Sequence, residues 1–427
     1  MRTLMLAIGC GIGFVAAADA GVIVVDQAGG GQFFHVQNAL MSAQTGDIIV
    51  IKSGDYRDQP ANTPTITAKS LVLIGEGPTR PVLNNLHVNQ LGAQQNVVVR
   101  GIEFRPVVPA FLAGGWVASC AGGVLFEDCV LVGGRGNNGN PWSPSIDGTP
   151  GLEVTNSSRV VLSRCALTGG VGIDEHFTGG EIDYHASGGG FGLSVQSSSV
   201  AAFDCSFVGG VGGNGPGAIN VPNDGGDGIR ASASTVRLAG CSVGGGMGGT
   251  FTNIVTLHSG DGGDGLVLTN GATCEAFDTT FTGGPIGVGT GPLGAVPGTG
   301  VVAPPGALTQ FAANARTFAL SAPAHVGQPL DITVLGEQGD VVLLLLGRGI
   351  EILQLGSSIG WLTMQPPLPA PLTLTTITAA NGDGSLTIPA PPIPIPGLSG
   401  IAFPFQAYFL GSGTPVAGSP SELVLLQ

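Results

Sequence analysis

Short runs in which apolar and polar residues alternate, separated by glycines, recur through residues 115–284. An alternation of period two places the apolar side chains on one face of a β-strand. Four of these runs share the signature Cys-x-hydrophobic-x-Gly-Gly, and a fifth has Thr279 at the cysteine position. The four cysteines are Cys129, Cys165, Cys205 and Cys241. Such self-similarity predicts a protein built from repeated coils of strand.

Each repeat unit combines strands with a glycine-rich insertion. Successive signature cysteines are 36, 40 and 36 residues apart. About twenty residues of each unit have the pattern of strand and turn, and the rest is insertion. A second motif precedes each signature: a glycine and alternating apolar residues, as in Gly151–Val154, followed by a polar turn such as Asn156–Ser158. The turns are expected to stack as a polar ladder. The insertions recur at one point of the unit, so they are expected to project on one side, where function is expected.

Residues 21–80 contain a strand, a glycine-rich turn and an amphipathic helix with Phe34, Val36 and Leu40 on one stripe, followed by the buried strand Ile48–Ile51. This order resembles the N-terminal cap and first coils of the pectin-lyase-like family of right-handed parallel β-helices. The resemblance implies that residues 21–284 form such a solenoid. It also implies that the helix covers the open end of the solenoid.

The repeats fade after Gly284, and a different pattern begins near Thr317. Residues 285–316 are rich in Gly and Pro and are interpreted as a linker or a last irregular coil. Residues 317–427 contain apolar strands such as Val341–Leu346 between Pro-rich and Asn-Gly turns. They predict a small antiparallel β-sandwich. The chain is therefore expected to be all-β, a capped parallel β-helix followed by a sandwich.

The first twenty residues have the pattern of a secretory signal peptide. Arg2 provides a positive start, Leu4–Ala17 is apolar, and a small-x-small cleavage site ends at Ala20. We therefore expect a secreted protein, extracellular or at the cell surface, with the periplasm as the other option. No later apolar run is long enough to cross a bilayer.

Composition narrows the choice of partners. The chain has 75 glycines among 427 residues, only 10% charged residues and a formal net charge of −14. A disordered chain would be richer in charge and poorer in apolar residues. Nucleic acid is excluded as a partner because phosphate recognition needs clustered Lys and Arg. A polyanionic glycan would need a bridging cation.

The signature cysteines are expected to form a structural ladder in the core. They share a register with apolar residues such as Phe203 and Phe207, so their side chains point inward. Disulfides between coils are an alternative, because stacked strands are close enough and export favours oxidation. A metal site is disfavoured because a linear ladder does not converge tetrahedrally.

Two groups of residues are candidate metal ligands. Asp224 and Asp227 recur as Asp261 and Asp264 in near-identical Asp-Gly loops, where stacked carboxylates would hold Ca²⁺. The alternative is that Asp-Gly suits tight turns. The second group lies in one polar loop and consists of Asp174, Glu175, His176, Asp183 and His185. It would bind a divalent metal or provide a base, and the alternative is a solvated loop.

Arg135, Trp142 and Tyr184 are candidates for a shallow platform on which a sugar ring stacks, with packing inside the loops as the alternative. Enzymes of the resembled family carry Gly-His-Gly segments, paired aspartates or an arginine base with acidic calcium ligands. None of these motifs is complete in this chain.

The closest approach to a catalytic set is a column formed by Asp128, Arg164 and Asp204, with Asp278 as a fourth member. We interpret it as outward-facing strand residues on an exposed face. The repeat arginines Arg164, Arg230 and Arg237 are expected to lack acidic partners. The sequence therefore favours a secreted or surface β-helix that presents glycine-rich loops to a polysaccharide or cell-surface glycan, with Ca²⁺ as the cofactor considered. The alternative is a polysaccharide lyase, esterase or hydrolase.

Overall fold

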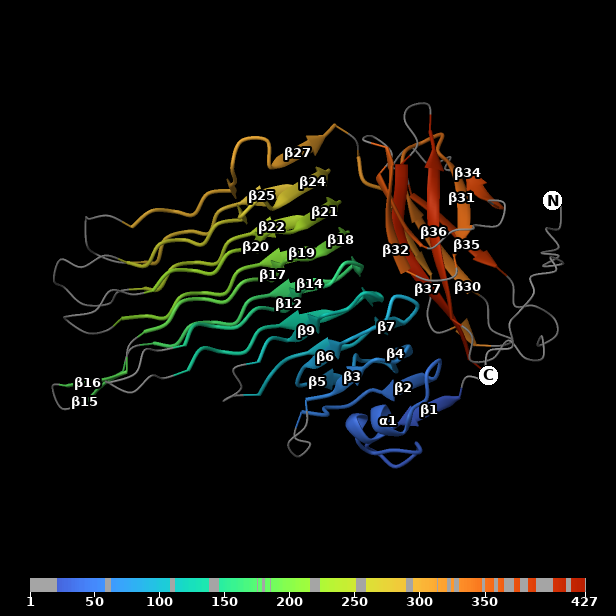
Figure 1. Cartoon of the computed structure of the whole chain (residues 1–427), viewed down its shortest axis with the longest axis horizontal. Coiled ribbons are helices and arrows are strands. Elements are labelled where there is room, and N and C mark those ends of the chain that lie inside the picture. The colour runs from blue at the N-terminus through green and yellow to red at the C-terminus, as the bar shows by residue number, and fades with distance from the viewer. Residues whose placement is uncertain are drawn as a thin grey trace.

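The computed structural model shows stacked coils of parallel strands beside an antiparallel β-sandwich (Figure 1). It describes residues 21–57, 63–107, 112–137, 146–174, 176–178, 181–184, 186–215, 223–250, 259–288, 295–312, 314–320, 324–325, 330–347, 350–356, 360–364, 372–376, 383–388, 402–411 and 416–426. The expected signal peptide lies outside these ranges.

Three parallel sheets form the walls of the β-helix, so the predicted fold class is confirmed. Sheet A has ten strands: β1 (Val22–Val25), β2 (Ile48–Lys52), β4 (Leu71–Glu76), β7 (Asn96–Arg100), β10 (Gly123–Glu127), β13 (Val160–Ser163), β18 (Ser199–Phe203), β21 (Thr235–Ala239), β24 (Thr273–Phe277) and β27 (Leu308–Phe311). Each strand pairs with the strand one coil away, so in the repeat region residues 36 to 40 positions apart become neighbours, as Leu125, Val161 and Ala201 do.

The other two walls are shorter. Sheet B has seven strands: β5 (Val82–Leu83), β8 (Glu103–Phe104), β11 (Val130–Val132), β14 (Ala166–Thr168), β19 (Ser206–Val208), β22 (Ser242–Gly244) and β25 (Thr280–Thr282). Sheet C has eight: β3 (Thr65–Thr67), β6 (Leu86–Asn89), β9 (Gly115–Ala118), β12 (Leu152–Thr155), β17 (Leu193–Gln196), β20 (Ile229–Ser232), β23 (Leu266–Thr269) and β26 (Val301–Val302). A coil runs from sheet C through A to B, and the glycine-rich segments return from B to C.

Single residues with left-handed backbone make the two tight corners of each coil. Between sheets A and B these residues include Asp128, Arg164 and Asp204, with φ of 52–53°. The expectation that they are strand residues on an exposed face is wrong, since they are corner residues. Between sheets C and A, Asn156 and Ser197 have φ of 48° and 49°. Asp and Asn tolerate this region better than most residues, which fits their frequency here.

One continuous apolar core fills the solenoid, and the predicted helix closes its first coil. Helix α1 (Val36–Ser42) buries Val36, Ala39 and Leu40 against the core. At the corner between sheets C and A, the predicted polar ladder is confirmed. The amide of Ser157 donates to Ser198 Oγ (3.0 Å), and the amide of Ser198 donates to Ser234 Oγ (3.1 Å).

The C-terminal part is antiparallel, as predicted. One sheet contains β28 (Thr317–Leu320), β30 (Leu330–Leu335) and β35 (Asp383–Ile388). A second contains β29 (Ala324–His325), β31 (Val341–Leu346), β34 (Leu372–Thr376), β36 (Ala402–Leu410) and β37 (Val416–Leu426), with β29 parallel to β37. A hairpin joins β32 (Ile350–Gly356) to β33 (Gly360–Met364). No helix in the described ranges is long and apolar enough to cross a bilayer.

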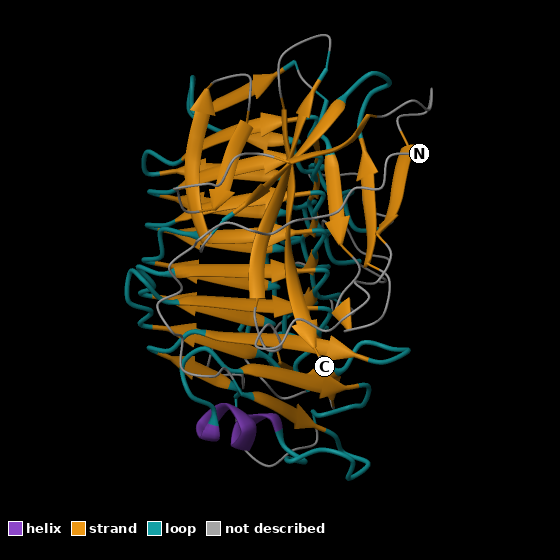
Figure 2. Cartoon of the chain, turned by 90° about the vertical axis from the view of Figure 1, so that its right-hand side faces the viewer, coloured by secondary structure: helices purple, strands orange, loops and turns teal. Residues whose placement is uncertain are grey.

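The sandwich lies against the outer face of sheet A, as two perpendicular views show (Figures 1 and 2). The outer face carries an apolar row that includes Leu125, Val161 and Phe203, and Ile350 of the sandwich packs on it. Among the described residues, strands β32 and β37 of the sandwich contact β10, β13 and β18 of sheet A. The sandwich therefore determines which faces of the solenoid remain available for a ligand.

Candidate functional site

The glycine-rich segments that project away from the sandwich (Figure 1) begin as an ordered array rather than as loops. Outgoing segments continue sheet B, and returning segments lead into sheet C. In the outgoing row, Gly209 and Gly212 donate to the next coil, at Gly244 O (2.9 Å) and Met247 O (2.9 Å). Gly210 donates to Gly190 O of the returning row (2.7 Å). Hydrogen bonding therefore repeats every three residues, the period of an extended polyproline-II-type chain.

Glycine is required in this array because backbones fill the space that a side chain would need. A Cβ on Gly210 would lie 2.0 Å from Gly170 O, and one on Gly226 would lie 1.9 Å from Gly190 O. Neither glycine has positive φ, so conformational freedom is not the reason. The array is comparable to collagen in this respect, since only glycine fits where chains meet.

Every third residue of the array carries a side chain outside the glycine rows, and this position holds the predicted calcium ligands, of which Asp224 is exposed and Asp227 is buried. Asp224 Oδ1 accepts the amide of Asp261 (2.9 Å), and Asp227 Oδ1 accepts the amide of Asp264 (3.0 Å). Asp264 Oδ1 in turn accepts the amide and hydroxyl of Thr299 (2.7 and 2.9 Å). We name this series the aspartate ladder. It satisfies outward N–H groups that the array itself leaves unpaired.

No three His, Cys, Asp or Glu side chains gather as a metal site among the residues that the structure describes. Asp174 is exposed and accepts the amide of Asn214 (2.9 Å). Glu175 and His185 lie outside the described residues. Backbone alone is described for His176 and Asp183, in the hairpin formed by β15 (His176–Thr178) and β16 (Glu181–Tyr184). Calcium and divalent-metal binding remain predictions.

The predicted sugar platform is described only in part. Arg135 is exposed on the outer face of the outgoing row. Trp142 lies outside the described residues, as does the side chain of Tyr184 in β16. The structure therefore leaves this prediction untested.

The outer face of sheet C carries a second aromatic and polar surface, which the sequence patterns did not indicate. Neighbouring strands align His87, Trp116, Glu153, Ser194 and Arg230 in one column, which we name the sheet C column. The Trp116 side chain is 38% exposed, and its ring meets His87 edge to face at 5.0 Å. Trp116 was overlooked because Gly115 stands where the other repeats have an apolar residue, such as Leu152. The Trp116–Val117 alternation was the available signal.

At the Arg230 end of the sheet C column, the positive charge is neutralised by a neighbouring carboxylate. Arg230 pairs with Asp227 (2.7 Å) and stacks over the Phe191 ring at 4.3 Å, while its side chain stays 50% exposed. Burial raises the pKa of Glu153 and lowers the pKa of His87. Both shifts favour the neutral forms.

The corner residues of the Asp-Arg-Asp column lie beneath the sandwich. Arg164 Nε contacts Asp128 Oδ1 (2.9 Å), and its guanidinium also bonds Glu127 and the Phe318 carbonyl of the sandwich. Glu127 is fully buried and lies 3.5 Å from Arg100. We name Arg100, Glu127, Asp128 and Arg164 the interface cluster. Arginine and carboxylates from adjacent coils do converge, but at a covered face that a polymer cannot reach.

The expectation that the repeat arginines lack acidic partners is wrong. Arg164 pairs with Asp128 and Glu127, Arg230 with Asp227, and Arg237 with Glu275 at 3.2 Å. Burial lowers the pKa of Arg164, but the two carboxylates outweigh burial and the net shift is upward. Most of these partners belong to a neighbouring coil, so spacing along the chain did not indicate them.

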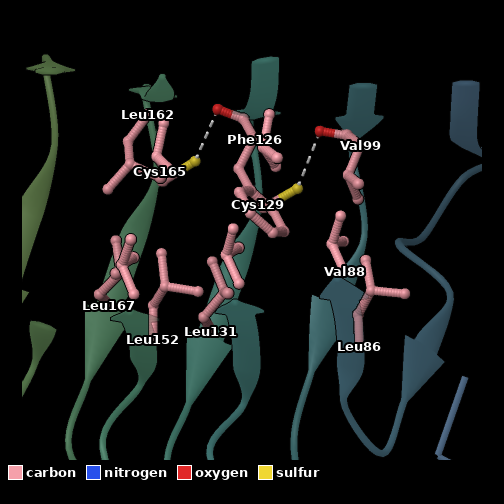
Figure 3. Close-up of a cluster of buried hydrophobic side chains, with 14 of the residues drawn as sticks. Leu86, Val88, Val99, Phe126, Cys129, Leu131, Leu152, Leu162, Cys165 and Leu167 are labelled. Atoms are coloured by element: carbon pink, nitrogen blue, oxygen red, sulfur yellow. Dashed lines mark hydrogen bonds between the residues drawn. The ribbon is translucent and has the colours of Figure 1, made fainter. Parts of the chain in front are cut away.

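The six cysteines in the described part of the chain are buried and form no disulfide in this structure. Cys129 Sγ donates to Val99 O and Cys165 Sγ to Phe126 O, each at 3.4 Å (Figure 3). Burial raises the pKa of the Cys129 thiol, which keeps it protonated and unreactive. Thr279 replaces the thiol with a hydroxyl that accepts the Cys241 amide at 3.4 Å.

Comparison with known proteins does not assign this chain to a family. No family model matches this sequence, and no curated protein matches it. The parallel β-helix architecture is thus the level at which the resemblance to pectin-lyase-like proteins is supported.

Proposed function

We propose that this protein is an exported β-helix that binds a neutral polysaccharide along the sheet C column. The observation that carries the proposal is the alignment of the exposed Trp116, edge to face with His87, with Glu153, Ser194 and Arg230 on successive strands. Aromatic faces stack on sugar rings, and polar side chains at regular intervals bond hydroxyl groups.

Several features support a neutral rather than an acidic polymer. The chain carries a net charge of −14, and Arg230 is already paired with Asp227. Successive strands lie about 4.8 Å apart, so the five side chains of the column extend roughly 19 Å. That length suits several sugar units of a linear chain. The sandwich packs on sheet A, whereas Trp116 and Arg230 on sheet C stay 38% and 50% exposed.

The test measures binding to soluble β-glucan, xylan and mannan, with polygalacturonate as the acidic comparison. Trp116→Ala should weaken binding by about fivefold to 150-fold, because loss of one stacked ring costs about 1–3 kcal/mol. Phe34→Ala is the matched control, since Phe34 is an exposed aromatic residue (56%) beside helix α1.

Equal binding by both variants, or binding to polygalacturonate alone, would contradict the proposal. Release of reducing or unsaturated sugars in the same reactions would instead support the enzyme alternative.

A further inference from the structure

The last coil of the glycine array departs from the others at two positions. Ile286 stands where the preceding coils have Gly172, Gly212 and Gly248. Pro297 stands where the preceding coils have Gly189, Gly225 and Gly262. Both changes occur in the coil that has no following coil.

At these two positions the inner glycines join one coil to the next. The amide of Gly248 donates to Pro285 O (3.0 Å), and the amide of Gly262 donates to Val296 O (3.0 Å). A Cβ on Gly262 would lie 1.9 Å from Gly284 O and 2.7 Å from Gly298 N, both in the following coil. At the Gly262 position, a glycine is therefore the condition for adding another coil. At the Gly248 position, a Cβ would instead meet Gly260 O (2.0 Å) and Asp261 O (2.5 Å) of the returning row.

Pro297 is incompatible with a following coil for two reasons. It has no N–H to donate, and its ring occupies the space into which a following backbone would pack. Ile286 places a branched side chain, 40% exposed, at the other row of the same edge. The inner coils exclude side chains from both positions.

The rest of this end has little other protection. Residues 283–302 contain no charged residue, although charge is a common means of blocking an edge. Strands β25, β26 and β27 have only three, two and four residues, so the sheets themselves present short edges. Helix α1 covers the opposite end. The glycine array is therefore the longest backbone edge at the last coil.

We propose that Ile286 and Pro297 terminate the glycine array and prevent a second copy of this chain from stacking on its open end. A second copy is the natural partner, because its own array presents the same hydrogen-bonding period. Without these side chains, the N–H groups that in the inner coils bond the following coil would be free to bond carbonyl groups of a second copy.

The test is the oligomeric state of the full chain carrying Ile286→Gly and Pro297→Gly together, measured by sedimentation over a hundredfold range of concentration. The double variant should self-associate at a concentration at least tenfold below that at which the unmodified chain does. Val288→Gly is the matched control, because Val288 is 71% exposed in the same coil at an outward position. It should behave as the unmodified chain does.

Circular dichroism and thermal unfolding establish that each variant is folded. If the double variant does not fold, the single variant Pro297→Gly restores the N–H and removes the ring, and should associate more weakly but measurably. Adding Val302→Lys at the edge should return the double variant to the monomer. A folded variant that stays monomeric, or a control that associates equally, overturns the proposal.

Discussion

At the residue scale, the array separates two uses of glycine. Gly240 takes a left-handed corner with φ of 65°, where its conformational freedom is used. Gly210 and Gly226 have no positive φ and are needed because a neighbouring carbonyl occupies the place of a Cβ. The second use depends on chains that are distant in sequence, so composition alone does not reveal it.

Gly210→Ala is expected to destabilise the protein by about 3 kcal/mol or more, because the new methyl group forces backbones apart in a packed array. Gly244→Ala is the matched control. It lies one coil along at an outward position, where the nearest atom to a Cβ is Thr282 Oγ1 at 3.3 Å, and should change stability by roughly 0.5 kcal/mol at most. Urea unfolding measures both, and equal losses would refute the packing argument.

At the element scale, the aspartate ladder of the glycine array and the ladder of core cysteines (Cys129, Cys165, Cys205 and Cys241) both link neighbouring coils by hydrogen bonds. Each uses a side chain from one coil to bond the backbone of a neighbouring coil: Asp224 bonds the following coil and Cys205 the preceding one. A parallel solenoid needs such links because its corners and array leave N–H groups that no strand partner accepts. The side chain of Asp264 is therefore bound to backbone, whether or not an ion also binds.

Asp264→Ala should lower the free energy of unfolding by about 1–2 kcal/mol, since two donors of Thr299 lose their acceptor. Asp264→Asn keeps a carbonyl oxygen and should recover most of this loss. Thermal melting with and without millimolar Ca²⁺ separates the roles. If the Asn variant is as unstable as the Ala variant and loses a calcium-induced shift, the carboxylate serves an ion.

At the scale of the whole molecule, the interface cluster ties the sandwich to the solenoid. Glu127 is fully buried between Arg100 and Arg164, and Ser421 of β37 bonds its carboxylate. Charges this deeply buried stabilise a contact only when every partner is in place. The two parts should therefore unfold together.

Glu127→Ala should cost about 3–5 kcal/mol, because it removes the fully buried carboxylate between two guanidinium groups and leaves them only Asp128. Glu275→Ala is the matched control on the same face of sheet A. Its pair with Arg237 is about one-fifth exposed, and its loss should cost about 1 kcal/mol or less. Chemical unfolding gives both values, and limited proteolysis should release the sandwich only in the Glu127 variant. Similar costs for the two variants would argue against the cluster.

The interface also predicts a pH dependence through Asp204. Burial raises the pKa of this carboxyl, and its Oδ2 lacks a hydrogen bond. Because the pKa of Asp204 is higher in the folded state than in the unfolded state, the folded protein favours the protonated carboxyl. The free energy of unfolding therefore falls as the pH rises from the unfolded pKa to the folded pKa. As the pH rises above about 4, the melting temperature of Asp204→Asn should therefore increase relative to that of the unmodified chain. Parallel curves would exclude this.

The sequence by itself determined the features that repeat in register, which are the coils, the inward cysteines and the serine ladder. It also predicted the capping helix and the antiparallel C-terminal part. These depend on strand periodicity and on the repeat length, both of which are local. It did not reveal Trp116, because an unusual Gly115 hides the motif.

Only the tertiary structure decided which residues of different coils meet and which face is covered. The glycine segments are an ordered array because each hydrogen bond joins residues in different segments, and Asp128, Arg164 and Asp204 are corner residues beneath the sandwich. Neighbours in a solenoid are set by stacking rather than by the chain, so pairing across coils and cover by another domain are decided only in three dimensions.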